Sequence, residues 1–252
     1  MTSRLAPRPR REKQAPAAIT SGRPKTAPRL VWRALVIAAL LLGHQFLLTL
    51  IHYFGGPALG IDPSAAGLNA ATIIGAATII ALPVGIDLRR RHRREAVGLV
   101  PVARDTRTIR LVAAAILISQ LPLAILALQG ATIWQAGGQV QLGVGRSMLS
   151  SSGPIAAFAL GIAVVLIAPV IEEILYRGYL LGALARHTHR VVAVFIASLC
   201  FMLIHAEPAN LIASLCLGVA TGICRISTRS LWPGLAVHIA NNAFGLWYLT
   251  QL

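Results

Sequence analysis

Apolar runs without charged residues alternate with shorter polar and basic segments along the chain. A helix needs about 20 residues to cross a membrane, and seven of the runs reach or approach this length. Lipid does not satisfy exposed peptide groups, and the runs lack the polar–apolar alternation of barrel strands, so we expect helices. The sequence therefore predicts an all-α polytopic membrane helix bundle with about seven transmembrane helices. They are expected at residues 34–51, 67–86, 111–133, 154–171, 191–204, 211–224 and 231–250.

The overall composition agrees with this pattern. Hydrophobic residues make up 56% of the chain, charged residues only 12%, and the mean hydropathy is +0.71. A soluble domain would have too few polar residues to cover its surface. The three cysteines, Cys200, Cys216 and Cys224, all lie in predicted spans, so we expect small core residues rather than disulfides or a thiolate metal cluster.

The basic residues predict the orientation of the bundle. The chain has 23 Lys and Arg against 8 Asp and Glu, nine of the basic residues precede the first predicted span, and eight lie at 89–110. By the positive-inside rule both segments are cytoplasmic, which puts the N-terminus inside the cell. Charge placed in this way favours anionic membrane lipids as partners, and no nucleic acid is expected. We expect the plasma membrane of a bacterium.

Three regions follow from these features. Residues 1–30 are rich in Arg, Pro and Ala, and they predict a disordered basic cytoplasmic tail without a cleaved signal peptide. Residues 31–133 contain the N-terminal transmembrane helices, and the spans themselves carry few ionisable groups. Residues 154–252 contain the motifs described below, so we expect them to form the catalytic transmembrane core.

Two adjacent carboxylates, Glu172 and Glu173, end an apolar run. Neighbours on a helix point about 100° apart, so the two side chains should have different functions. Glu173 and Arg177 have the i,i+4 spacing of a helical ion pair, which leaves Glu172 to point into the bundle. Pro169 has no N–H for the carbonyl of Val165, so we expect a kink and one free acceptor before the pair. The alternative is a charge cluster at a helix end, with Arg177 reaching the cytoplasmic interface.

Two further pairs of polar or aromatic residues lie one helical turn apart. Phe201 and His205 share one face of a predicted span, and His238 and Asn242 share one face of the last span. Asn241 is the competing position for the amide, about 100° around the helix from Asn242. Two imidazoles, a free carboxylate and an amide on three helices are suited to activating water.

The position of a turn brings the first two motifs together. If residues 154–171 and 191–204 form an antiparallel hairpin that turns near 186–190, Glu172 lies opposite His205. This register requires the first of the two helices to continue beyond residue 178. His44, in the first predicted span, is better explained by a hydrogen bond between helices than by a ligand role.

The motifs Glu-Glu-x-x-x-Arg, Phe-x-x-x-His and His-x-x-x-Asn occur in this order on successive apolar segments. Over residues 154–250 they resemble the CAAX protease and bacteriocin-processing family (CPBP, or Abi) of intramembrane endopeptidases. The resemblance implies hydrolysis of a peptide bond in a peptide or membrane-protein substrate. It also implies that Glu173, with Arg177, supports the site.

The resemblance implies a role for each of the other four motif residues. Glu172 would activate a water molecule and His205 would help to hold that water, while His238 and Asn242 would stabilise the oxyanion. Glu172, His205 and His238 would also suit a divalent metal such as zinc if a metal is used, and a metal-free reaction is equally compatible with them. A binding or immunity protein without catalysis, or a component of a proton-coupled transporter, are the alternative functions.

Overall fold

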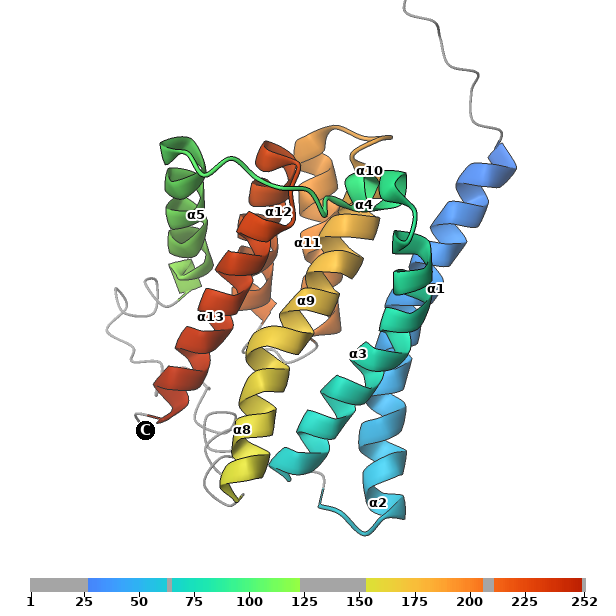
Figure 1. The fold of residues 1–252 in the computed structure, drawn as a ribbon, viewed down its shortest axis with the longest axis vertical. Coiled ribbons are helices and arrows are strands. Elements are labelled where there is room, and N and C mark those ends of the chain that lie inside the picture. Colours follow the sequence, from blue (N-terminus) through green and yellow to red (C-terminus); the bar gives the residue numbers. More distant parts are fainter. Residues whose placement is uncertain (1–26, 63–64, 123–152, 206–210, 251–252) are drawn as a thin grey trace, which may run out of the picture. The chain divides into compact units, whose positions relative to one another are not determined.

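A computed structural model describes residues 27–62, 65–122, 153–205 and 211–250, and it describes side chains from residue 32 to residue 247 within those ranges. Every regular element in these ranges is a helix (Figure 1). Residues 36–252 form one compact unit, and the preceding unit, residues 1–35, contributes the first residues of a helix to the described ranges. The predicted tail lies almost entirely outside the described residues.

The first half of the chain forms two long helices and two shorter ones. The first long helix continues through a π-helical turn and a short α-helical end. Gly98 ends α4 (Arg91–Val97) because it adopts φ +97°, where its N–H donates to the carbonyl of Arg94. Asp105 begins α5 (Thr106–Ser119) by accepting the Thr108 N–H at 2.8 Å. These elements are α1 (Ala27–Leu50), η1 (Ile51–Gly55), α2 (Gly56–Ala58), α3 (Ala66–Leu88), α4 (Arg91–Val97) and α5 (Thr106–Ser119).

The fourth predicted span is longer than expected and is interrupted by π-helical turns. We call Pro154–Leu184 the interrupted helix. It passes residue 178, as the predicted hairpin register requires, and a turn at 185–189 leads into the next helix. Its segments are α8 (Pro154–Ile162), η2 (Ala163–Ile167), α9 (Ala168–Glu172), η3 (Glu173–Leu180) and α10 (Leu181–Leu184).

The last three helices lie close to their predicted ranges: α11 (Arg190–Ile204), α12 (Leu211–Thr228) and α13 (Trp232–Thr250). Four helices in the described ranges are long and apolar enough to cross a membrane, and α11 is apolar but shorter. The predicted span at 111–133 lies partly outside the described residues. The prediction of an all-α polytopic membrane bundle is confirmed, and the protein is an integral membrane protein. The four long apolar helices are Trp32–Ala58, Ala66–Leu88, Pro154–Leu184 and Leu211–Thr228.

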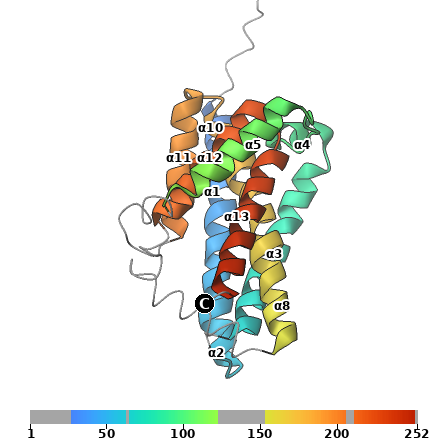
Figure 2. The same ribbon diagram turned by 90° about the vertical axis from the view of Figure 1, so that its left-hand side faces the viewer.

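The interrupted helix packs between α3 and α13, while α11 and α12 pack against each other (Figure 1). Figure 2 shows α5 lying across α12 and α13. The close approach of α11 and α12 requires Gly218 and Gly222, because a Cβ at either position would lie 2.9 Å from a side chain of α11. This packing brings α11, α13 and the interrupted helix together around the two glutamates.

Candidate functional site

The two adjacent glutamates have different surroundings, as their helical spacing predicts. Glu173 is 1% exposed, and its Oε1 lies 3.3 Å from Nη1 of Arg177, which is 2% exposed. The contact is an ion pair without the alignment of a hydrogen bond, since Arg177 Nη1 has no hydrogen-bond partner in the described part of the chain. Because Arg177 is buried within the bundle, it does not form the interfacial charge cluster considered above. Glu172 keeps a side chain that is 13% exposed.

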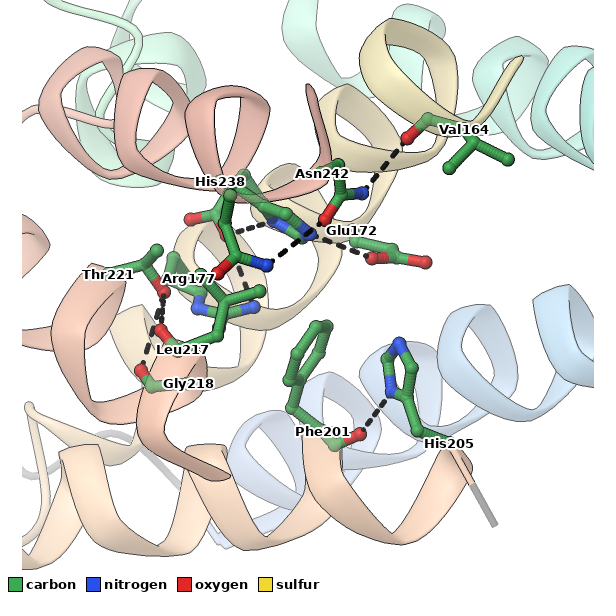
Figure 3. Close-up of polar contacts among 12 residues, drawn as sticks. Val164, Glu172, Arg177, Phe201, His205, Leu217, Gly218, Thr221, His238 and Asn242 are labelled. Atoms are coloured by element: carbon green, nitrogen blue, oxygen red, sulfur yellow. Dashed lines mark hydrogen bonds and ion pairs between the residues drawn. The ribbon is translucent and has the colours of Figure 1, made fainter. Parts of the chain in front are cut away.

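His238, on α13, connects the two glutamates. Its Nδ1 lies 3.0 Å from Glu173 Oε1, and its Nε2 lies 3.6 Å from Glu172 Oε2 (Figure 3). An ionised carboxylate can only accept, so the ring donates its Nδ1–H to Glu173. The i,i+4 spacing in the sequence predicts that Glu173 pairs with Arg177. Nothing in the sequence predicts that His238 also contacts Glu173. Through Nε2 of His238, α13 therefore also contacts the carboxylate of Glu172.

The aromatic ring of Phe201 packs against both Arg177 and His238. The guanidinium carbon of Arg177 lies 4.2 Å from the ring centroid of Phe201, a cation–π contact between fully buried groups. Phe201 also meets His238 edge-on at 5.7 Å and Tyr176 edge-on at 5.4 Å. The phenylalanine of the second motif thus packs against the arginine of the first and the histidine of the third.

His205 follows the last turn of α11, and its position determines which ring nitrogen carries a proton. Its Nδ1 lies 2.8 Å from the carbonyl oxygen of Phe201, which accepts, so Nδ1 is the protonated nitrogen of the neutral ring. The other nitrogen, Nε2, is then an acceptor. Figure 3 shows the side chains of His205 and Glu172 projecting from different helices toward the same region. This is the arrangement that the hairpin register predicts.

Asn242 bonds to the interrupted helix at the place where proline disturbs it. Its Nδ2 donates to the Val164 carbonyl at 2.9 Å. In the π-helical turn η2, the Ala168 N–H donates to the carbonyl of Ala163, five residues earlier. By the same spacing, the backbone N–H of residue 169 would donate to the carbonyl of Val164. This residue is Pro169, which has no N–H. The predicted acceptor, Val165, was therefore wrong by one residue, because the turn is π-helical rather than α-helical.

Asn241 contacts a different helix. Its Oδ1 accepts a hydrogen bond from Gln120 Nε2 at 3.0 Å, which ties α13 to the end of α5. Its Nδ2 lies 3.5 Å from Asn242 Oδ1. Of the two candidates, Asn242 is the one whose side chain contacts the helix that carries the glutamates.

The predicted metal ligands are not grouped as a metal site. Among the residues that the structure describes, no three His, Cys, Asp or Glu side chains are placed to hold a metal ion. His238 and His205 each use Nδ1 for a hydrogen bond within the protein, and such a bond leaves Nε2 of a histidine ring available to a ligand. A metal cofactor therefore stays a prediction.

The fold and the site define a multi-span membrane protein in which carboxylates and histidines from separate helices meet inside the bundle. Residues 154–244, which contain all three motifs, match the family described as type II CAAX prenyl endopeptidase Rce1-like. This match supports the resemblance of the segment to the CAAX protease and bacteriocin-processing family, which the three motifs indicate.

One curated relative supports the same assignment. The chain is 28% identical over 79 residues to the Bacillus subtilis (strain 168) protein named "Putative membrane peptidase YdiL". This match covers 31% of the present chain and 32% of the relative, so the chain spans about a third of that protein's length. No solved structure matches.

Proposed function

We propose that the protein is an intramembrane endopeptidase that hydrolyses a peptide bond in a membrane-associated protein or peptide, with Glu172 activating the water. One observation carries the proposal. Of the two adjacent glutamates, Glu173 is enclosed by Arg177 and His238, whereas Glu172 keeps an accessible carboxylate beside His238. The family match and the relative's name support the class of reaction.

The reaction begins when Glu172 takes a proton from a water molecule. The water oxygen attacks the carbonyl carbon of the peptide bond, and the carbonyl electron pair moves onto oxygen to give a tetrahedral oxyanion. When the carbon–nitrogen bond breaks, the proton held by Glu172 passes to the leaving nitrogen. One water and one peptide bond thus become a carboxylic acid and an amine.

His205, Asn242 and His238 can each contribute a different hydrogen bond to this reaction. His205 has its unprotonated Nε2 available as an acceptor, which suits it to hold the attacking water. Asn242 uses one N–H on Val164, and the second N–H of the same amide is left to stabilise the oxyanion. His238 already donates Nδ1–H to Glu173, so it can donate from Nε2 only when the ring is doubly protonated.

Incorporation of ¹⁸O tests the catalytic assignment without knowledge of the substrate. Membranes containing the full-length protein are incubated in H₂¹⁸O, and peptides with one ¹⁸O at a new C-terminus are identified by mass spectrometry. Glu172→Gln is expected to lose these peptides. Glu95→Gln is the matched control, because Glu95 pairs with Arg91 on an exposed helix surface, and it should release them as the wild type does. Labelled peptides that persist in Glu172→Gln would remove this residue from the mechanism.

A chelator tests the metal separately. We expect ¹⁸O-labelled peptides to be released equally with and without EDTA, because the described residues do not group three metal ligands. Loss of release in EDTA, restored by added zinc, would contradict the metal-free reaction. Peptides that are retained by the wild type and never cleaved would instead favour the binding or immunity alternative.

We further propose that the protein lies in a bacterial plasma membrane with its N-terminus in the cytoplasm, and that anionic lipids contact its basic segments. The concentration of basic residues before the first span and at 89–110 supports this orientation. A thiol-specific, membrane-impermeant label on a cysteine introduced at Arg91 checks it. The label should react only in inside-out vesicles, whereas reaction in intact cells would reverse the topology.

A further inference from the structure

Gly234 is a buried glycine in the first turn of α13 that belongs to none of the three motifs. It lies four residues before His238, so the two residues share one face of that helix. A Cβ at residue 234 would lie 3.2 Å from Oε2 of Glu173 and 3.1 Å from the backbone carbonyl oxygen of Thr221 on α12. The first turn of α13 therefore comes this close to both neighbours because residue 234 has no side chain.

Both carboxylate oxygens of Glu173 lie against α13. Oε1 accepts the hydrogen bond from Nδ1 of His238 at 3.0 Å. Oε2 is fully buried, and it has no hydrogen-bond partner within the described part of the chain. It lies beside the first turn of α13, where the partial positive charge of a helix N-terminus favours a carboxylate. Glu173 is therefore in contact with two successive turns of α13, at Gly234 and at His238.

The neighbour on α12 leaves no freedom for a side chain at residue 234. Thr221 is fully buried, and its hydroxyl donates to the carbonyl oxygen of Leu217 at 3.0 Å (Figure 3). The atom nearest to a Cβ at residue 234 is the backbone carbonyl oxygen of Thr221, which cannot turn away as the end of a flexible side chain can. A methyl group there would be accommodated by a shift of a few tenths of an ångström between α13 and α12. Because His238 lies one turn further along α13, that shift changes its distances to both glutamates.

We propose that Gly234 is a positioning residue of the active site: it sets how closely α13 approaches Glu173, and it thereby places His238 between the two glutamates. The inference rests on the proposed function, since it concerns the geometry of the same reaction. Nε2 of His238 lies 3.6 Å from Oε2 of Glu172, so a small displacement of α13 acts on the proposed catalytic carboxylate. Glycine is a weaker helix former than alanine, and this close approach gives a reason for its place in α13.

Nuclear magnetic resonance tests the contact between Glu173 and α13 without any substrate. Pro233-Gly234 is the only Pro-Gly pair in the sequence, so carbonyl-¹³C proline combined with ¹⁵N-glycine isolates the Gly234 amide signal of the full-length protein. Glu173→Gln is expected to shift this signal, because it removes a negative charge beside the first turn of α13. Glu95→Gln should leave the signal unchanged. A Gly234 signal that is the same in wild type and Glu173→Gln would overturn the proposal, whether or not the protein is an enzyme.

Gly234→Ala tests the effect on His238. In protein labelled with ¹⁵N-histidine, the His238 ring signals are identified by their loss in His238→Gln. Gly234→Ala should shift these ring signals and should release ¹⁸O-labelled peptides about tenfold more slowly, since a misplacement of about 1 Å can slow a reaction about a hundredfold and the shift here is smaller. Gly245→Ala, on the same helix, is the matched control. Its Cβ meets nothing within 4 Å, so it should keep the wild-type signals and rate.

The outcomes separate the two proposals. If folded Gly234→Ala keeps the wild-type His238 signals or the wild-type rate of release, the positioning role is wrong while the endopeptidase stands. If Gly234→Ala does not fold, the Gly234 amide signal in Glu173→Gln decides whether the contact exists. If the wild type releases no labelled peptides, the endopeptidase is wrong, and the His238 signals in Gly234→Ala still decide whether Gly234 positions that ring.

Discussion

The chain contains two ion pairs with the same i,i+4 spacing and opposite burial, which allows a direct test of the site's energetics. Glu173 and Arg177 are 1% and 2% exposed, whereas Arg91 and Glu95 are 86% and 54% exposed. Glu173→Gln keeps the shape of the side chain but leaves Arg177 buried without a counter-charge. Removing one partner of a buried pair typically destabilises a protein by about 3–5 kcal/mol. The cation–π contact with Phe201 remains, so we expect a loss near the lower end, about 3 kcal/mol.

Removing Arg177 instead of the charge of Glu173 should destabilise the protein less, because Glu173 keeps His238 as a partner. Arg177→Met leaves Glu173 with its hydrogen bond to His238 Nδ1 at 3.0 Å, so the carboxylate keeps one buried partner. We therefore expect Arg177→Met to lose less stability than Glu173→Gln. The double variant should lose less than the sum of the two single losses, because no unpaired charge is left in it. On the exposed pair, Glu95→Gln should change stability by less than about 1 kcal/mol.

Thiol accessibility measures these differences on the intact protein. The three cysteines are partly or fully buried, so a thiol-reactive fluorophore reports unfolding in detergent or lipid nanodiscs. Denaturant titrations of wild type, the two single variants and the double variant give the free energies of unfolding. Equal stability of Glu173→Gln and wild type would refute the reasoning, as would strict additivity in the double variant. Either result would mean that the buried charges are not coupled.

Two further predictions concern packing. Asn242→Leu leaves the Val164 carbonyl without a donor and should lower the free energy of unfolding by about 1–3 kcal/mol. Pro169→Ala restores a backbone N–H next to this carbonyl. In the double variant, Pro169→Ala should therefore reduce the loss of stability that Asn242→Leu causes. Gly218→Ala places a Cβ 2.9 Å from α11 and should destabilise the protein by about 1–3 kcal/mol, whereas Gly245→Ala, which meets nothing within 4 Å, should be neutral or stabilising. Denaturant titration checks both, and a neutral Gly218→Ala would contradict the close α11–α12 contact.

The identity of the site helix and of its glutamates could be predicted from local sequence. Apolar length predicts the long helices, and a spacing of four residues predicts that Arg177 pairs with Glu173. The 100° between neighbours on a helix predicts that Glu172 points elsewhere, and it has the greater exposure of the two. These features depend on backbone geometry within one helix, so they need no information about the rest of the bundle.

The partners of those groups depend on how separate helices pack. The sequence contains no signal that His238 bonds to Glu173 or that Phe201 packs against Arg177. Each contact joins residues at least 24 positions apart, and its existence depends on the rotation and depth of two helices rather than on any local period. The sequence by itself determined the helices and the divergence of the two glutamates. Only the tertiary structure decided which side chains from α11 and α13 surround them, because helix packing rather than helix periodicity sets those distances.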